Sequence, residues 1–287
     1  MTTAAPPLAI TGVTGVVGRE VARQLAEAGL ELRLLARNPA QAPELPGAVV
    51  LPCDYGDPTV SGPSLAGVET LFMVSGRENE HRVAEHKAFI DAARAAGVRH
   101  VVYTSFMGAA PDAIFTLARD HHATEEYIEA AGLTYTFLRD CLYLDYFEYF
   151  AGEDGVIRGP AGDGRVAAVA QADVAHSAAA ILKNPGRHAN ATYTLTGPEA
   201  LTLTEAAAVI TQARGRTVTF HHETIAEAYE SRKRWPAPQW QYDAWVSTYT
   251  AIAGGELAEV TDDVERLTGR RATSLAELLK GSPPAAG

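Results

Sequence analysis

Cysteine is scarce in this chain. Only two of the 287 residues are cysteines, Cys53 and Cys141, which is too few for a disulfide framework or a cysteine-based metal site. We expect both to be buried thiols within predicted strands. The paired histidines at 121–122 and 221–222 do not indicate a metal site either, because neighbouring side chains on a helix or strand point in different directions.

Positive charge and long apolar runs are also in short supply. Lysine and arginine total 24 against 35 acidic residues, giving a net charge of −11. Such a chain lacks the basic field that attracts nucleic acids, so we expect no nucleic-acid partner. There is no apolar run of about 18 residues, and the opening MTTAAPPLAITG does not read as an export signal. We therefore expect no membrane partner and a cytoplasmic location.

Short apolar runs alternate with amphipathic patterns through the first 150 residues, which favours an α/β fold with helices on both faces of a parallel sheet. Strands are predicted over residues 8–12, 31–37, 48–53, 69–75, 98–106 and 134–141, and helices over 18–29, 80–96 and 116–131. Gly97 and Gly132 follow two of these helices, where a left-handed residue is favoured. The pattern predicts a Rossmann-type doubly wound sheet.

After Phe150 the sequence becomes rich in glycine and charge, which is typical of loops. We place a domain boundary there, between a dinucleotide-type domain over 1–150 and a smaller α+β substrate or lid domain over 151–287. Residues 171–196 predict one more helix and strand that return to the first domain. The second domain is expected to contain a capped helix from Thr202, a strand over 217–222, further helices and a frayed tail.

A glycine-rich loop, TGVTGVVG, joins the first strand to the first helix. In a dinucleotide fold, three such glycines allow a tight turn, close approach to a pyrophosphate, and packing of the helix on the strand. The start of the helix presents free N–H groups and a positive dipole end to an anion. The residues predicted to hold the cofactor here are Gly12, Thr14, Gly15, Val16, Val17 and Gly18.

The end of the second predicted strand reads LLARNP. A carboxylate there would bind a ribose hydroxyl, whereas Arg37 can grip a 2′-phosphate with a bidentate fork. The sequence therefore favours NADP(H) as cofactor and leaves NAD(H) open; the alternative for Arg37 is a solvated surface side chain.

Asp54 and Tyr55 after the third strand are candidates to border the adenine, although Asp57-Pro58 also suits a plain turn. Ser75 and Gly76 after the fourth strand are predicted to reach the middle of the dinucleotide.

The motifs TGVTGVVG, LLARNP, DYGDP, DAARAAGV, VVYTS and AAGLTYTFLR together resemble the NmrA-like family of atypical short-chain dehydrogenases, in particular its type 2 NAD(P)H:quinone oxidoreductase branch. The resemblance runs nearly end to end. It implies a Rossmann domain that binds NADP(H), a small C-terminal domain over the nicotinamide and, in the quinone reductases, hydride transfer to a quinone. By the same resemblance, Ser75, Thr104, Ser105 and Phe106 fall at the nicotinamide end.

The chain departs from this family at one position. Glu126 stands where similar quinone reductases have a lysine, which removes a cation expected near the nicotinamide ribose. His122, four residues earlier, is the candidate proton donor, because an imidazole can supply a proton near neutral pH. A helix-surface histidine is the alternative.

Two aromatic groups are candidates for a substrate wall. LRDCLYLDYFEYF predicts a short helical stretch leaving the sheet edge, where Tyr143, together with Phe106, can contact a flat substrate. RWPAPQWQYDAW is either a lid or the packing of the second domain.

The leading hypothesis is an NADPH-dependent oxidoreductase acting on a quinone or a similar conjugated carbonyl compound. The alternatives are a non-catalytic NADP(H)-binding redox sensor that signals to a protein partner, and a tailoring enzyme of aromatic natural products. A homo-oligomer is compatible with the sequence, which does not fix the oligomeric state.

Overall fold

The protein is built around a seven-stranded sheet with the order β3-β2-β1-β4-β5-β6-β9. The computed structural model describes residues 7–281, so the tail expected to fray lies almost wholly outside the described residues. The strands are β1 (Leu8–Ile10), β2 (Leu32–Ala36), β3 (Ala48–Pro52), β4 (Thr70–Met73), β5 (His100–Phe106), β6 (Thr134–Asp140) and β9 (Ala191–Leu195). The pairs β3–β2, β2–β1, β1–β4 and β4–β5 are parallel. The predicted Rossmann-type sheet is confirmed.

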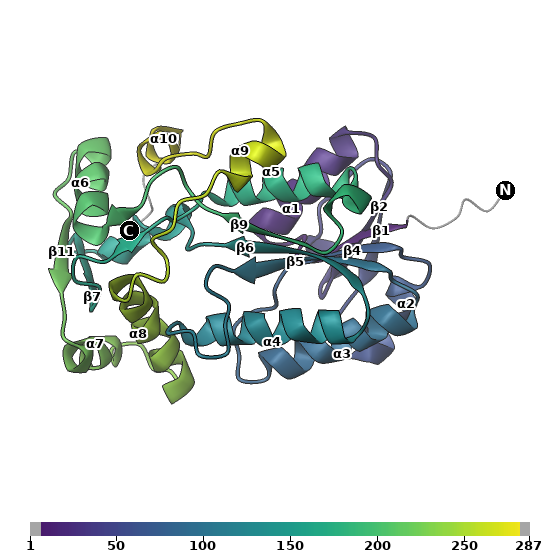
Figure 1. Ribbon diagram of the computed structural model, residues 1–287, viewed down its shortest axis with the longest axis horizontal. Helices are drawn as coiled ribbons and strands as arrows, with labels where there is room; N and C mark the ends of the chain where they lie inside the picture. The colour runs from purple at the N-terminus through teal and green to yellow at the C-terminus, as the bar shows by residue number, and fades with distance from the viewer. Residues whose placement is uncertain (1–6, 282–287) are drawn as a thin grey trace. The chain divides into compact units, whose positions relative to one another are not determined.

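Helices cover both faces of this sheet (Figure 1). Their bounds are α1 (Val16–Glu27), α2 (Pro58–Leu65), α3 (Arg82–Ala95), α4 (Thr116–Ala130) and α5 (Gln171–Leu182). In Figure 1, α1 and α5 lie on one face and α2, α3 and α4 on the other. Every residue of β1, β2 and β5 is buried, as expected for strands covered on both sides. Gly97 and Gly132 adopt the predicted left-handed conformation, with φ of 93° and 72°.

The structure adds short elements to those predicted. Helix α2 was not predicted; Asp57 caps it, accepting a hydrogen bond from the backbone N–H of Thr59, and Pro58 occupies its first turn. The short helical stretch predicted around residue 146 is present as two 3₁₀ helices. The 3₁₀ elements are η1 (Pro39–Gln41), η2 (Leu144–Tyr146), η3 (Tyr149–Ala151) and η4 (Pro185–His188).

Both cysteines are buried free thiols, as predicted, although each lies one residue beyond a strand rather than within it. Burial raises the pKa of the Cys53 thiol to about 11 and that of Cys141 to about 12. Both side chains are therefore protonated, unreactive thiols at neutral pH.

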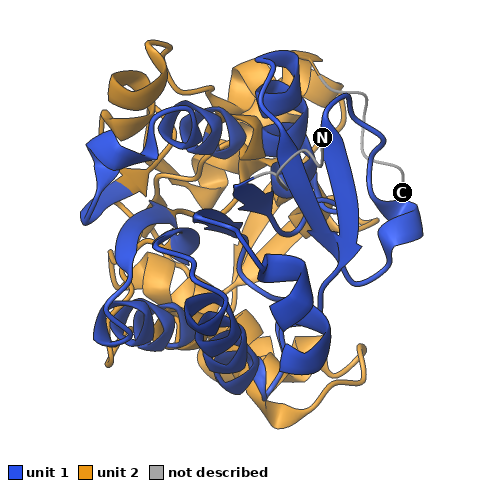
Figure 2. Ribbon diagram, turned by 90° about the vertical axis from the view of Figure 1, so that its right-hand side faces the viewer, with its two compact units in different colours: residues 1–105, 120–139, 174–193 blue, residues 106–119, 140–173, 194–287 orange. Residues whose placement is uncertain are grey.

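The chain forms two compact units, coloured separately in Figure 2. Unit 1 comprises residues 1–105, 120–139 and 174–193, and unit 2 comprises 106–119, 140–173 and 194–287. The boundary at residue 150 stays a prediction. The remaining elements are β7 (Val156–Gly159), β8 (Arg165–Val166), β10 (Leu201–Thr202), β11 (Thr219–His222), α6 (Leu203–Arg214), α7 (Ile225–Arg232), α8 (Gln239–Ala253), α9 (Asp263–Thr268) and α10 (Leu275–Gly281).

Unit 2 contains two small two-stranded sheets. Strands β11 and β7 pair in parallel, whereas β10 and β8 pair in antiparallel. The helix predicted from Thr202 is present as α6, and its capping box joins Thr202 and Glu205 reciprocally. Within residues 7–281, none of the helices has the length and apolar character needed to cross a bilayer.

Candidate dinucleotide site

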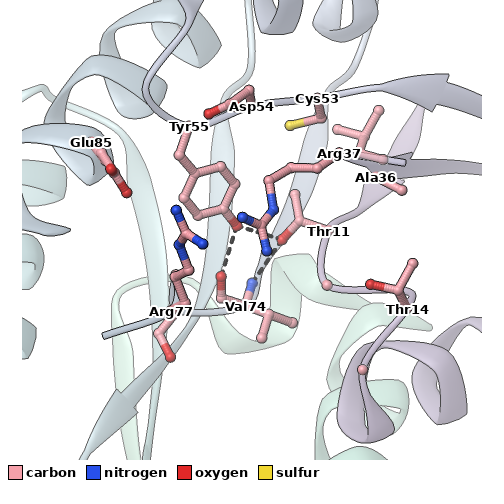
Figure 3. A pocket seen from close by; sticks show the side chains of 15 residues that line it. Thr11, Thr14, Ala36, Arg37, Cys53, Asp54, Tyr55, Val74, Arg77 and Glu85 are labelled. Atoms are coloured by element: carbon pink, nitrogen blue, oxygen red, sulfur yellow. Dashed lines mark hydrogen bonds between the residues drawn. The ribbon is translucent and has the colours of Figure 1, made fainter. Parts of the chain in front are cut away.

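A pocket of about 350 Å³ lies at the carboxyl ends of four neighbouring strands of unit 1 (Figure 3). Strand β1 sits between β2 and β4, so the order of the sheet reverses there. Ligands of open α/β sheets bind at such a reversal. The pocket is lined by Thr11, Gly12, Thr14, Gly15, Leu35, Ala36, Arg37, Cys53, Asp54, Tyr55, Val74, Ser75, Gly76, Arg77 and Glu85. Eight of the predicted cofactor residues are among them.

The loop between β1 and α1 depends on glycine at two positions. Gly12 has a φ of 66°, and a Cβ there would lie 2.7 Å from the Val74 side chain. A Cβ on Gly18 would lie 2.4 Å from the carbonyl oxygen of Gly12. Gly15 is less restricted, because its nearest neighbour would be that same oxygen at 3.4 Å. Gly12 and Gly18 thus shape the turn, while Gly15 leaves the backbone open to a guest.

The first turn of α1 is suited to an anion. Its N-cap is Gly15, which has no side chain to accept from the helix, and its first turn contains no acidic residue. The unpaired N–H groups and the positive end of the helix dipole are therefore available to a phosphate. Val16 is 59% exposed and Val17 is buried, so any contribution of Val17 or Gly18 to binding comes from the backbone. These features fit a pyrophosphate.

Two arginines add positive charge to the pocket. Figure 3 shows Arg37, from the end of β2, and Arg77, after β4, directed toward the pocket with Tyr55 drawn between them. Among the described residues, neither guanidinium has a hydrogen-bonding or ion-pair partner. The sequence predicted Arg37 and missed Arg77, although Arg77 directly follows the predicted Ser75-Gly76.

Two carboxylates also line the pocket, and each has a local partner. The Asp54 carboxylate accepts a hydrogen bond from the Gly56 N–H at 2.9 Å, in the manner of a turn. Glu85 of α3, which the sequence did not reveal, accepts from the Asn79 side-chain amide at 3.1 Å. The role of Asp54 beside an adenine stays a prediction.

Tyr55 braces the ends of the strands. Its hydroxyl lies 2.7 Å from Thr11 Oγ1 and donates to the Val74 carbonyl at 2.7 Å. Its ring stacks on Phe89 at 4.2 Å between centroids, and burial raises the pKa of its phenol well above the ordinary value. Tyr55 is thus a neutral wall of the pocket that also connects β1, β3 and β4.

Gly76 is held from both sides by a buried polar network. Its N–H donates to Nε2 of His86 at 2.9 Å, while Arg82 Nε donates to its carbonyl at 3.1 Å. The His86 ring therefore carries its proton on Nδ1, which donates to Thr124 Oγ1 at 2.9 Å. Burial, with a further contribution from the Arg82 charge, lowers the pKa of His86 to about 3. A Cβ on Gly76 would lie 3.0 Å from His86 Nε2, so a larger residue there would have to displace the imidazole by a few tenths of an ångström.

Thr104 and Ser105, on β5, both form internal hydrogen bonds. Thr104 Oγ1 accepts from the backbone N–H of Ser75 at 2.8 Å and is not among the residues that line the pocket. Ser105 donates to the buried Glu125, which also accepts a bidentate pair from Arg139. A direct contact of Thr104 with the cofactor stays a prediction, and its observed contact positions Ser75.

His122 and Glu126 lie one turn apart on α4, outside the residues that line the pocket. The His122 Nε2 and a Glu126 carboxylate oxygen are 3.6 Å apart, and the Glu126 side chain is 69% exposed. As expected, the neighbouring His121 side chain points in a different direction from His122: it is buried and contacts Tyr103 and Arg82. The geometry gives His122 an acidic partner, and its role as proton donor stays a prediction.

The predicted substrate residues Phe106 and Tyr143 belong to unit 2. Phe106 is buried against Phe115, with ring centroids 4.9 Å apart. The Tyr143 hydroxyl donates to Asp140 at 2.5 Å, and burial raises the pKa of this phenol well above its ordinary value. Neither lines the pocket of unit 1, so their contact with a substrate stays a prediction. The described residues contain no group of three or more potential His, Cys, Asp or Glu metal ligands.

A glycine turn that leads into a helix N-terminus at the reversal of a parallel sheet, with unpaired guanidinium groups beside it, is the architecture of a dinucleotide-binding Rossmann protein. Comparison with known proteins defines the family. The family model described as NAD(P)H-binding matches residues 12–185.

Similar proteins extend over nearly the whole chain. Quinone oxidoreductase 2 of Escherichia coli is 34% identical over 94% of this chain and 96% of its own. An NAD(P)H azoreductase of Xenophilus azovorans is 32% identical over 97% and 98%. The crystal structure of the E. coli NADPH-dependent quinone oxidoreductase with NADPH matches with a TM-score of 0.88, 33% identity, and coverage of 96% and 99%. The chain belongs to the NAD(P)H-binding, NmrA-like oxidoreductase family, which confirms the resemblance stated from its motifs.

Proposed function

We propose that this protein is an NADPH-dependent reductase that transfers hydride to a quinone or a related flat, conjugated compound. The observation that carries the proposal is the pocket of unit 1, where a glycine turn and an unpaired Arg37 lie side by side. The quinone oxidoreductase and azoreductase names of two relatives support a conjugated acceptor.

Bound NADPH would supply the hydride, and the residues of the chain would bind and orient the dinucleotide. The backbone at Gly15 and the start of α1 would hold the pyrophosphate, and Arg37 would pair with the 2′-phosphate. Ser75, fixed by Thr104, would face the middle of the cofactor. A quinone that accepts hydride needs one further proton to become a hydroquinone, which water or His122 would supply.

Oxidation of NADPH, followed by its absorbance with a panel of quinones, tests the activity. We expect turnover above the uncatalysed background with at least one quinone. We also expect the KM for NADH to be higher than the KM for NADPH. Absence of turnover with every quinone would overturn the reductase proposal. Tight NADPH binding combined with that absence would favour a redox sensor. The sequence feature that suggests a sensor is Glu126, which stands where similar quinone reductases have a lysine.

Arg37→Gln tests cofactor choice. Loss of a charge-assisted hydrogen bond costs about 1.5–3 kcal/mol, or roughly 10- to 150-fold in affinity. We expect the Kd for NADPH to rise by that factor and the Kd for NADH to change little. Calorimetric titration with both dinucleotides measures this effect.

Arg77→Gln separates the two cations of the pocket, and Arg270→Gln, on an exposed arginine of unit 2, is the control. If Arg77 only adds to the field of the pocket, its removal weakens both dinucleotides by a similar, smaller factor. Equal losses of NADPH and NADH affinity in Arg37→Gln would contradict recognition of the 2′-phosphate by Arg37.

A further inference from the structure

A second pocket, of about 460 Å³, lies within unit 2. It is formed by residues of η3 and β7 together with the end of α7 and one side of α8, and it shares no lining residue with the pocket of unit 1. Its volume is within the range of about 300–1,000 Å³ that is typical of small-molecule sites. The reductase proposed above makes no use of it.

Five of its twelve lining residues are aromatic, namely Tyr149, Phe150, Trp235, Trp245 and Tyr249. Trp235 is 50% exposed and Tyr149 is 61% exposed, so two large aromatic side chains of the same pocket are open to solvent. Exposed aromatic side chains around a pocket indicate a binding surface rather than a packed core. Such rings favour a flat, aromatic guest.

The pocket also holds one uncompensated positive charge. Of its three arginines, Arg158 pairs with Asp154 at 2.7 Å and the buried Arg232 pairs with Glu223 at 3.0 Å. Arg234 instead lies over the Trp235 ring, 3.9 Å from its centroid. No carboxylate partner for Arg234 occurs among residues 7–281, in a protein whose net charge is −11. This arrangement leaves a guanidinium fork available to an anion at the edge of an aromatic surface.

The two aliphatic hydroxyls of the pocket already have backbone partners. The hydroxyls of Ser231 and Thr248 donate to the carbonyls of Ala228 and Ala244. A suitable ligand is therefore apolar over most of its surface and carries a single negative group.

From these observations we propose that the unit 2 pocket is a binding site for a flat aromatic monoanion. Such a ligand carries a carboxylate or sulfonate on a single aromatic ring or on two fused rings. The rings contact Trp235, Trp245 and Tyr249, and the anionic group pairs with Arg234. This site is a property of unit 2 and does not depend on the reductase activity.

Titration of the full chain with 2-naphthoate, without any dinucleotide, tests the site. Two of the three tryptophans line the pocket, so binding should quench tryptophan fluorescence, and calorimetry should give one site per chain. The neutral 2-naphthamide, which has the same rings without the charge, should bind about tenfold or more weakly.

Arg234→Gln should reduce the preference for naphthoate over naphthamide to near unity, and Trp245→Leu should weaken both probes. Arg270→Gln is the matched control and should change neither. A thermal unfolding midpoint close to that of the wild type shows that each variant is folded. Absence of binding, equal binding of the two probes to the wild type, or an unchanged preference in Arg234→Gln would each overturn the proposal. Since no cofactor or acceptor is present, these outcomes leave the reductase proposal untouched.

Discussion

Gly15 and Gly18 lie one helical turn apart at the start of α1, yet a methyl group on each would meet different surroundings. On Gly18 it would overlap the carbonyl of Gly12 at 2.4 Å, inside the turn. On Gly15 it would meet only that oxygen, at 3.4 Å, on the exposed side that lines the pocket. Gly15 therefore allows a ligand to approach the backbone, whereas Gly18 allows the helix to pack on the strand.

Gly15→Ala and Gly18→Ala should therefore fail in different ways. Gly18→Ala should lower the free energy of unfolding by about 1–3 kcal/mol or more, because a tightly packed turn cannot absorb the extra group. Gly15→Ala should change stability by less than about 1 kcal/mol, the usual scale for an N-cap change, and should weaken dinucleotide binding at least tenfold. Urea unfolding and calorimetric titration of both variants measure these effects.

Gly186→Ala is the control, because a Cβ at Gly186 would meet nothing within 4 Å. Equal stability losses in Gly15→Ala and Gly18→Ala would show that both glycines serve the turn alone. Unchanged dinucleotide binding in Gly15→Ala would place the pyrophosphate elsewhere.

Sequence reasoning reached some residues of the pocket and missed others for a physical reason. Arg37 and the glycines follow from a motif with fixed spacing along the chain. Arg77 and Glu85 reach the pocket only through the path of the loop after β4 and the placement of α3, which no local pattern encodes. The burial of His86 and Arg82 around Gly76 likewise depends on tertiary packing, since both residue types are usually exposed.

At the scale of elements, the loop between β4 and α3 depends on a neutral histidine. His86 is 1% exposed and accepts the Gly76 N–H, so a proton on Nε2 would break that bond and place a second charge near Arg82. The pKa of His86 is lowered to about 3 by burial first and by Arg82 second. The unfolded chain, with an ordinary histidine pKa near 6.5, takes up a proton that the folded chain refuses. This contribution to stability is complete above about pH 6.5 and is lost as the pH falls toward 3.

His86→Gln should accordingly flatten the acid side of the stability profile. One refused proton accounts for at most about 1.4 kcal/mol per pH unit, and the variant should lose up to that much of the slope between pH 6 and 4. Urea unfolding at several pH values measures this slope. The buried His121, whose pKa is also lowered by burial, keeps the slope of the variant above zero. His81→Gln, at an exposed side chain, should leave the slope unchanged, and an unaltered slope in His86→Gln would contradict a neutral buried imidazole.

The observed strands and long helices of the sheet lie close to their predicted bounds. The apolar periodicity and the flanking glycines that mark these elements are local features of the sequence. Helix α2 escaped prediction because it is short and contains Gly62 and Pro63, both poor helix formers. Its start was nevertheless readable, since Asp57-Pro58 places an N-cap before a proline of the first turn. The short helical stretch expected around residue 146 is present as two 3₁₀ helices, with Leu144 and Phe147 buried in the core.

At the scale of the whole molecule, the two units are interleaved along the chain. Through residues 174–193, unit 1 includes most of α5 and the first part of β9, far beyond the end of β6. Val174, Ile181 and Leu182 of α5 are at most 2% exposed. Burial of each such side chain contributes about 1.5–3 kcal/mol before the entropy cost of ordering the helix is subtracted. Because the net stability of a domain is only about 5–15 kcal/mol, exposing the sheet face under α5 is enough to unfold unit 1.

The dinucleotide unit should therefore not fold as the contiguous fragment 1–150. That fragment retains every residue of the pocket but leaves the face of the sheet under α5 uncovered and β6 without its neighbour β9. We expect it to show no cooperative thermal transition by circular dichroism, whereas a fragment over 1–196, which restores α5 and β9, should show one. A cooperative transition and dinucleotide binding in the 1–150 fragment would mean that the boundary after Phe150 separates independent domains and that the returning segment is dispensable. Failure of both fragments would instead show that unit 1 requires the later segments of unit 2 to fold.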